Sequence, residues 1–479
     1  MALEKNTPHV LIFPYPSQGP LNCMMKLAEL LAIVGLHVTV LNTEDTRQRL
    51  FLSSASLPAI PLLRFKSIPD GLPDDQPRDA SLLIDVAESL NMNSRLLLRD
   101  LISEDSSDGF PPVTCLIVDG FLPSVVDLAE EIGLPCLSFR TPSACSIWAY
   151  LCIPKLLQNG VLPFGEGVDF NEVVQGVPGM EGFLRRRDLP EFFRGAKNAD
   201  DPELKFMATV TAYSGKARGF ILNTTEVLES TAVHHIQSQI PVTYSVGPLH
   251  AILESYRSAC GTTDASPHTS SLWQEDTACL KWLDSQPDKS VVYVSFGSLT
   301  TLMREELHEF YSGLVNSGHK FLWVLRPDMI QDPGWTDEIK RSLPEEGRII
   351  SWAPQQKVLA HRAVGCFLTH SGWNSTLESI IEGVPMLCWP FFLDQQINSR
   401  FVSEIWRIGL DMKDIHNREV VEKMVRQMME GESAARFRQS ARDMADAVKE
   451  SIAEGGSSLR EFHRLIEDIK SMSNSVVLN

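Results

Sequence analysis

The sequence predicts an α/β protein made of two doubly wound domains. Short apolar runs of strand length alternate with segments of helical spacing, and this alternation appears twice, on either side of a stretch poor in apolar residues. At 479 residues the chain is too long for one ordinary hydrophobic core. Hydrophobic residues make up 43% and charged residues 22%, which are the proportions of a globular protein.

The first half begins with a βαβ unit. An apolar run from His9 to Phe13 stops at Pro14, which is typical of a buried parallel strand that ends in a loop. Apolar residues then repeat at helical spacing over residues 24–31, and Gly35 ends this helix before a second strand over residues 37–41. In such a unit the functional loop lies at the carboxyl end of the first strand.

Further strands are expected before the chain turns polar. They run over Val113–Val118, Pro135–Phe139 and Gly219–Leu222, with a helix over Leu122–Ile132 between the first two. Residues 258–271 are rich in Ser, Thr, Gly and Asp, and this shift in composition indicates a linker. We therefore predict an N-terminal domain over residues 1–250, a linker over 251–275 and a C-terminal domain over 276–455.

The second half repeats this layout. Its expected strands are Val291–Phe296, Phe321–Leu325, Arg348–Ser351, Cys366–Thr369 and Met386–Trp389. Gly297 and Ser298 follow the first of them, where the backbone N–H groups of a loop can hold an anion.

Charge and cysteine content exclude several classes of protein. A net charge of −18 argues against a nucleic-acid partner, which needs a basic face. The nine cysteines follow neither CxxC nor metal-ligand spacing, so we expect reduced thiols in a cytoplasmic protein without a metal site. No stretch approaches the roughly 18 to 20 apolar residues of a membrane helix, so we expect no membrane insertion.

The most informative stretch runs over residues 352–395. Within it an apolar run is followed by polar residues from His370 onwards, and a helical pattern begins at Ser375. Free N–H groups at such a strand-to-helix turn can hold phosphate, and Gly372 lets the backbone come close. His370, Asn374 and Ser375 supply side-chain donors at the same turn.

A structural interpretation of this turn is also open. Ser375 and Glu378 have the spacing of a helix capping box, and Trp373 fits a core position.

The whole stretch from Trp352 to Gln395 resembles, nearly position for position, the signature box of plant secondary-product UDP-glycosyltransferases. Other landmarks of that family are matched in family order by FPYPSQG, LNTE, LNTTEVLE, VGPL, WLDSQP, VVYVSFGS and GGSS. The resemblance implies two facing Rossmann-like domains, the GT-B fold, with the reaction in the cleft between them. It also implies that a last helix, within residues 456–479, crosses back to the N-terminal domain.

The resemblance assigns residues to each part of a UDP-glucose co-substrate. Uracil is assigned to Trp352, Ala353 and Gln355, and the ribose to Glu378. The diphosphate is assigned to His370, Asn374 and Ser375, near the loop with Ser298, and the sugar to Trp373, Asp394 and Gln395. A box ending in Gln, as here, is associated in the family with glucose. No permanently bound cofactor and no metal ion are implied, and we expect a monomer.

The catalytic base of the family is absent. In the family a His follows Gln-Gly after the first strand and removes the proton of the acceptor hydroxyl, while an Asp matched here by Asp119 orients that His. This sequence has Gln18, Gly19 and then Pro20, which cannot titrate. For Asp119 the alternative is a local role, either as a cap of the helical region from Leu122 or in an Asx turn with Gly120.

Three accounts of Pro20 are open. In the favoured one the acceptor needs no base, because a carboxylic acid with a pKa near 4 is ionised at neutral pH. An acidic phenol or a hemiacetal belongs to the same class, whereas an alcohol would lose the roughly 10²- to 10⁴-fold that a base contributes. In the second account Asp119, its pKa raised by burial, is the base. In the third the chain binds a UDP-sugar without ordinary transfer, or its N-terminal pocket performs another reaction.

The acceptor side is the least readable part of the sequence. We expect a pocket for a small lipophilic molecule that includes Phe121, Ser143 and Trp148.

Overall fold

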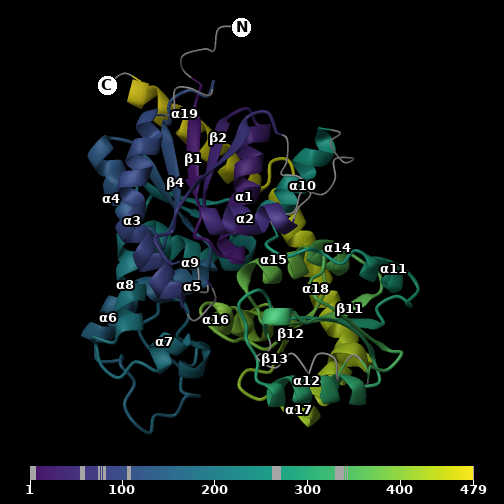
Figure 1. The fold of residues 1–479 in the computed structure, drawn as a ribbon. Helices are drawn as coiled ribbons and strands as arrows, with labels where there is room; N and C mark the ends of the chain where they lie inside the picture. The colour runs from purple at the N-terminus through teal and green to yellow at the C-terminus, as the bar shows by residue number, and fades with distance from the viewer. Residues whose placement is uncertain are drawn as a thin grey trace.

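The computed structural model describes residues 7–53, 60–73, 76, 78, 82–104, 109–260, 271–329, 339, 341 and 343–477. These residues form two parallel sheets, each covered by helices on both faces, and Figure 1 shows the two domains one above the other. The predicted fold class is thus confirmed.

The N-terminal sheet has the strand order β3-β2-β1-β4-β5-β6-β7, and all its pairs are parallel. Its strands are β1 (His9–Phe13), β2 (His37–Thr43), β3 (Leu63–Ile68), β4 (Cys115–Asp119), β5 (Cys136–Arg140), β6 (Gly219–Leu222) and β7 (Thr243–Ser245). The strand order reverses between β1 and β4, so the loops that follow these two strands diverge and leave a crevice at the carboxyl edge.

Helices cover both faces of this sheet. They are α1 (Gln18–Ile33), α2 (Glu44–Ser53), α3 (Leu83–Glu104), α4 (Pro123–Ile132), α5 (Ala144–Leu151), α6 (Ile153–Gln158), α7 (Glu191–Arg194), α8 (Pro202–Ser214), α9 (Glu226–Gln239) and α10 (Leu249–Ala259), with a 3₁₀ turn η2 (Arg186–Asp188). Side chains of β1 alternate between the faces: Val10 and Ile12 join the core with α1 and α10, while Leu11 and Phe13 join the core with α3 to α5.

The C-terminal sheet has the order β10-β9-β8-β11-β12-β13 and is also parallel. Its strands are β8 (Val291–Ser295), β9 (Lys320–Val324), β10 (Gly347–Ile350), β11 (Val364–Thr369), β12 (Met386–Cys388) and β13 (Gly409–Asp411). The order reverses between β8 and β11, which gives this domain its own crevice.

The C-terminal domain carries its helices in the same manner. They are α11 (Ala278–Asp284), α12 (Arg304–Asn316), η3 (Pro327–Met329), α14 (Gln355–Leu359), α15 (Trp373–Ile381), α16 (Gln395–Arg400), the π-helical turn η4 (Phe401–Ile405), α17 (Arg418–Met429) and α18 (Gly431–Ile452). The chain then continues into α19 (Ser457–Val477). Among the described helices none has the length and apolar character needed to cross a bilayer.

The expected linker over 251–275 must be corrected at its start. Helix α10 extends through Ala259 and contacts α1, with Leu249, Ile252 and Leu253 buried. Apolar spacing at three and four residues explains this helix. Residues 261–270, the centre of the expected linker, lie outside the described residues.

The last helix belongs to the other domain. α19 contacts β4 and β7 of the N-terminal sheet and follows α18, which contacts α15; Figure 1 shows it in yellow beside the purple strands. Phe462, Leu465 and Ile469 on α19 are fully buried in the core that also holds Val10 and Ile12.

Phe462→Ala should lower the free energy of unfolding by about 3 to 5 kcal/mol, because a fully buried ring leaves a cavity. Urea unfolding followed by fluorescence measures this. The matched control is Glu467→Ala on the same helix, where the side chain is 71% exposed and the expected change is within about 0.5 kcal/mol. Equal stability of Phe462→Ala and the control would contradict the packing of α19 on the N-terminal sheet.

Candidate active site

A cavity of about 790 Å³ lies between the two domains. Its walls come from the loops after β1 and β5 in one sheet and from those after β8, β10, β11 and β12 in the other. Ligands of open parallel sheets bind outside the carboxyl ends of the strands, and this cavity joins the crevices of both sheets.

Every residue that the resemblance assigns to the donor lines this cavity. The set is Ser298, Trp352, Ala353, Gln355, His370, Trp373, Asn374, Ser375, Glu378, Asp394 and Gln395. The fold therefore gathers residues from four loops and from α14, α15 and α16 on one side of the cavity, the donor wall.

The start of α15 excludes the capping-box alternative. The helix begins at Trp373 with Gly372 as its N-cap, so Ser375 lies inside the helix and does not precede it. Among the described residues no side chain caps this helix. Its first N–H groups thus lack a side-chain acceptor, and this is the arrangement in which helix N-termini hold anions.

Two glycines enclose the imidazole of His370. A Cβ atom on Gly297 would lie 2.3 Å from Nε2 of His370, and one on Gly372 would lie 2.5 Å from the same atom. Larger residues at these positions would displace the ring. Burial lowers the pKa of His370 to about 4, so at neutral pH the ring offers an N–H dipole and no positive charge.

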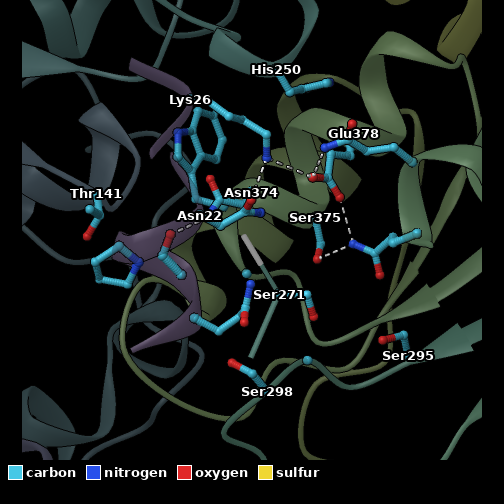
Figure 2. A pocket seen from close by; sticks show the side chains of 18 of the residues that line it. Asn22, Lys26, Thr141, His250, Ser271, Ser295, Ser298, Asn374, Ser375 and Glu378 are labelled. Atoms are coloured by element: carbon cyan, nitrogen blue, oxygen red, sulfur yellow. Dashed lines mark hydrogen bonds and ion pairs between the residues drawn. The ribbon is translucent and has the colours of Figure 1, made fainter. Parts of the chain in front are cut away.

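The carboxylate of Glu378 is held by amide groups. Gln355 donates from Nε2 to Oε2 of Glu378 at 2.8 Å and also to Oγ of Ser375 at 2.8 Å, while Gln356 donates to Oε1 of Glu378 at 2.9 Å. The Tyr293 hydroxyl in turn donates to Oε1 of Gln355 at 3.1 Å. Figure 2 shows Glu378 and Ser375 within this network. A carboxylate fixed in this way is suited to accept hydrogen bonds from a ligand.

An unpredicted aromatic residue covers Trp352. The ring of Trp273 stacks on that of Trp352, with centroids 4.7 Å apart and an interplanar angle of 26°. The backbone N–H of Asp276 donates to the carbonyl of Trp352 at 2.9 Å. One face of Trp352 is thus occupied, and the opposite face remains for an aromatic ligand.

The residues assigned to the sugar are already engaged through part of their polar groups. Oε1 of Gln395 accepts from the N–H groups of Phe391 and Phe392 at 2.8 and 3.0 Å, so Gln395 offers its amide nitrogen to a ligand. Oδ2 of Asp394 accepts from Asn398 at 2.8 Å, and burial raises the pKa of Asp394 to about 6. The indole N–H of Trp373 donates to the carbonyl of Asn223 at 2.8 Å, so this N–H is not available to a sugar.

The donor wall contacts the first turn of α1, which carries Pro20. Nδ2 of Asn374, assigned to the diphosphate, donates to the carbonyl of Gly19 at 2.9 Å. Pro20 lines the cavity at this point, in the first turn of α1.

Asp119 lies behind this wall and not on it. It is 2% exposed and is not among the residues that line the cavity. Its Oδ1 accepts from the N–H of Phe121 at 2.9 Å, which is the local turn considered as the alternative role, and Oδ2 has no hydrogen-bond partner among the described residues. Burial raises the pKa of Asp119 to about 6, opposed by that hydrogen bond and by the charge of Arg140.

Of the three residues expected in the acceptor pocket, Phe121 lines the cavity and the other two do not. Ser143 is the N-cap of α5, where Oγ accepts from the N–H of Ser146 at 3.2 Å. Trp148 is buried, stacks on His235 and donates from Nε1 to the carbonyl of Pro178 at 2.9 Å. Local helix capping and core packing explain both positions, so the expectation is corrected.

Several lining residues were not found from the sequence. They include Tyr15, Asn22, Lys26, Leu83, Thr141, Tyr150, Met207, His250 and Ser271. For Asn22 and Lys26 a signal existed, since they stand four residues apart on a helix whose other residues are mainly apolar. For His250, whose pKa is lowered to about 4 by burial, the sequence offers no comparable signal.

No group of three or more His, Cys, Asp or Glu side chains arranged to hold a metal ion occurs within the described ranges. All nine cysteines lie within those ranges and are free.

Solved structures of glycosyltransferases share this fold. A UDP-glucose:anthocyanidin 3-O-glucosyltransferase in complex with UDP is similar with a TM-score of 0.81 and 25% identity, over 98% of this chain and 100% of that chain. Os79 from O. sativa in complex with UDP is similar with a TM-score of 0.78 and 27% identity, over 96% of this chain and 100% of that chain.

Sequence comparison gives the same result. The family profile described as UDP-glucoronosyl and UDP-glucosyl transferase matches residues 211–436. The myricetin 3-O-rhamnoside 1,2-glucosyltransferase of Crocosmia x crocosmiiflora is 47% identical over 99% of this chain and 98% of its own length. The 7-deoxyloganetic acid glucosyltransferase of Catharanthus roseus is 46% identical over 97% of this chain and 98% of its own length. Because such identity extends over nearly the whole chain, this protein belongs to the plant family 1 UDP-glycosyltransferases, GT-B enzymes that use a UDP-sugar as co-substrate.

Proposed function

We propose that this protein transfers glucose from UDP-glucose, with inversion, to a small lipophilic metabolite whose attacking oxygen is ionised or acidic. A carboxylic acid is the favoured acceptor, and acidic phenols and hemiacetals belong to the same class. The observation that carries this proposal is Pro20 at the cavity wall, at the position where the family resemblance implies a base.

The donor wall supplies what the leaving group needs. The acceptor oxygen forms a bond to the anomeric carbon as the bond from that carbon to the diphosphate breaks, and UDP leaves on the opposite side. Negative charge then grows on the diphosphate. The neutral ring of His370, the side chains of Asn374 and Ser375 and the start of α15 are dipoles directed at this charge, and such preorganised dipoles stabilise the transition state.

At the position of Pro20 the acceptor side has no side chain that can take up a proton. Tyr15 and Tyr150 of the N-terminal domain line the cavity, and burial raises the pKa of both phenols, so both are protonated at neutral pH. Asp119 is ionised above about pH 6 but is 2% exposed and lies behind the wall. A base contributes about 10²- to 10⁴-fold to transfer onto an alcohol, and an ionised acceptor does not need it.

The alternatives are less well supported. Asp119 as a substitute base requires the acceptor to reach a carboxylate outside the cavity lining. A UDP-sugar binder without transfer is disfavoured by relatives that are named as glucosyltransferases. Those names do not decide the acceptor class, because one relative is named for an acid and the other for a rhamnoside.

An acid and the alcohol of the same carbon skeleton test the acceptor class directly. We expect kcat/KM for the acid to exceed that for the alcohol by about 10²-fold or more, because only the acid is ionised before attack. Chromatographic detection of the glucose ester and the glucoside, with UDP release as a second signal, measures both. Equal or faster transfer to the alcohol would overturn the proposal.

Pro20→His should raise kcat/KM for alcohols by about 10²-fold or more and change it little for acids, since it restores a base where the resemblance implies one. Pro20 lies in the first turn of α1, where a backbone N–H is not needed, and a His can therefore replace it without breaking the helix. Pro20→Ala is the matched control and should give no gain. An equal gain in both variants would show that the effect comes from space at this position.

Asp119→Asn separates an orienting role from a basic one. In the native background we expect kcat/KM for acids to stay within about tenfold, because Asn can still accept from the N–H of Phe121. In the Pro20→His background the same change should remove most of the gain on alcohols, because the new imidazole loses its orienting carboxylate. Loss of acid transfer in the native background, with stability retained, would favour Asp119 as the base.

A further inference from the structure

Two helices from different domains contact each other beside the donor residues. On α1 of the N-terminal domain, Asn22 and Lys26 stand four residues apart; on α15 of the C-terminal domain, Asn374 and Glu378 do the same. The helices are joined at two places: Nδ2 of Asn374 lies 2.9 Å from the carbonyl oxygen of Gly19, and Nζ of Lys26 lies 3.9 Å from Oε1 of Glu378. Figure 2 shows Lys26 extended toward Glu378, with Asn22 and Asn374 beside it.

Lys26 is a largely buried cation whose side chain is held in one direction. Its side chain is 13% exposed and that of Glu378 is 5% exposed. Nζ also donates to Oδ1 of Asn22 at 2.7 Å, which fixes the end of the side chain. Burial lowers the pKa of Lys26, and the charge of Glu378 opposes this. An ion pair in such surroundings is screened much less than one at the surface.

Lys26 gives Glu378 a contact from the other domain. Gln355 and Gln356, which bind its two oxygens, both belong to the C-terminal domain. Lys26 approaches Oε1 from the N-terminal domain, and among the described residues its removal would leave the amide groups of Gln355 and Gln356 as the hydrogen-bonding partners of the buried carboxylate. The rotation of the carboxylate about its last bond then depends on fewer contacts.

We propose that Lys26 is a positioning residue for the nucleoside part of the donor: it holds the carboxylate of Glu378 so that both oxygens meet a vicinal diol. This rests on the proposed donor site, in which Glu378 accepts from the ribose. A diol donates two hydrogen bonds to a fixed carboxylate, whereas a 2′-deoxyribose donates one. Lys26 therefore acts on the discrimination between ribose and deoxyribose, and it does so from the domain that binds the acceptor.

The test compares two donors in the full-length enzyme: UDP-glucose, and the analogue in which 2′-deoxyribose replaces the ribose of the nucleotide. We define the donor ratio as kcat/KM for UDP-glucose divided by kcat/KM for the deoxyribose analogue. Lys26→Met should lower this ratio by about tenfold, the size of one hydrogen bond to a charged group, mainly by raising KM for UDP-glucose. Lys26→Arg, which keeps the charge, should retain most of the native ratio. Lys26→Gln, which keeps a polar end without charge, should behave as Lys26→Met and serves if the Met variant does not fold.

Lys205→Met is the matched control. Lys205 lies on α8, its side chain is 66% exposed and it is not among the residues that line the cavity. Its replacement removes one positive charge away from the site, so the donor ratio should stay native. An unchanged ratio in Lys26→Met and Lys26→Gln, with unfolding midpoints near the native one, would overturn the inference. An equal fall in the control would also overturn it, because the effect would then be one of overall charge.

Calorimetric titration of the native protein with UDP distinguishes failure of the role of Lys26 from failure of the proposed function. If UDP does not bind, the proposed donor site itself fails. If UDP binds and the ratio does not respond to Lys26, the donor site stands and only the role of Lys26 is rejected.

Discussion

The contact between α1 and α15 is the interaction on which the site depends. Each helix follows the central strand of its sheet, β1 or β11, at the place where strand order reverses, so both begin at the mouth of a crevice. Where the domains face each other, Asn374 contacts Gly19 in the first turn of α1, next to Pro20, and Lys26 contacts Glu378. The residues assigned to the donor thereby also set the position of this turn on the acceptor side. The donor site is consequently a property of both domains and not of the C-terminal domain alone.

Burial between two sheets determines the charges that operate in this site. The low dielectric of the closed interior disfavours ionised forms, which is why His370 is neutral and why the pKa of Asp394 is raised to about 6. The wall opposite the diphosphate therefore works through oriented N–H dipoles. Arg326, 1% exposed, donates to the carbonyls of Gly297 and Thr300 and so holds the loop after β8 against His370. Its guanidinium fixes the geometry of these dipoles from behind.

The central strands could be predicted from the sequence because they are buried on both faces and appear as unbroken apolar runs, as in β1, β4, β8 and β11. The edge strand β3 was missed because Leu63 to Ile68 alternates with polar residues. The three-residue strands β7 and β13, with the sequences TYS and GLD, were missed because they are not apolar runs, whereas the equally short β12 reads MLC. The donor residues other than Ser298 lie in one stretch, Trp352 to Gln395, and could be named from the family resemblance. Lys26 and Trp273 could not, because they reach the site from distant parts of the chain through tertiary contacts. Ser143 and Trp148 were misassigned because proximity to a strand end does not distinguish a helix cap or a core ring from a pocket residue.

The presence of Asp119 without a neighbouring His has a structural explanation. Arg140, at the end of β5, is fully enclosed, and its guanidinium lies so close to the backbone that a Cβ atom on Gly120 would be 2.1 Å from its Nη1. Ser214 and Thr211 supply neutral acceptors to this cation, and Asp119 supplies the negative charge that a buried cation requires. The influence is mutual, since Arg140 opposes the rise in the pKa of Asp119. Asp119 would therefore be needed for the strand ends of β4 and β5 even in an enzyme whose acceptor arrives ionised, and its retention does not by itself argue for proton transfer.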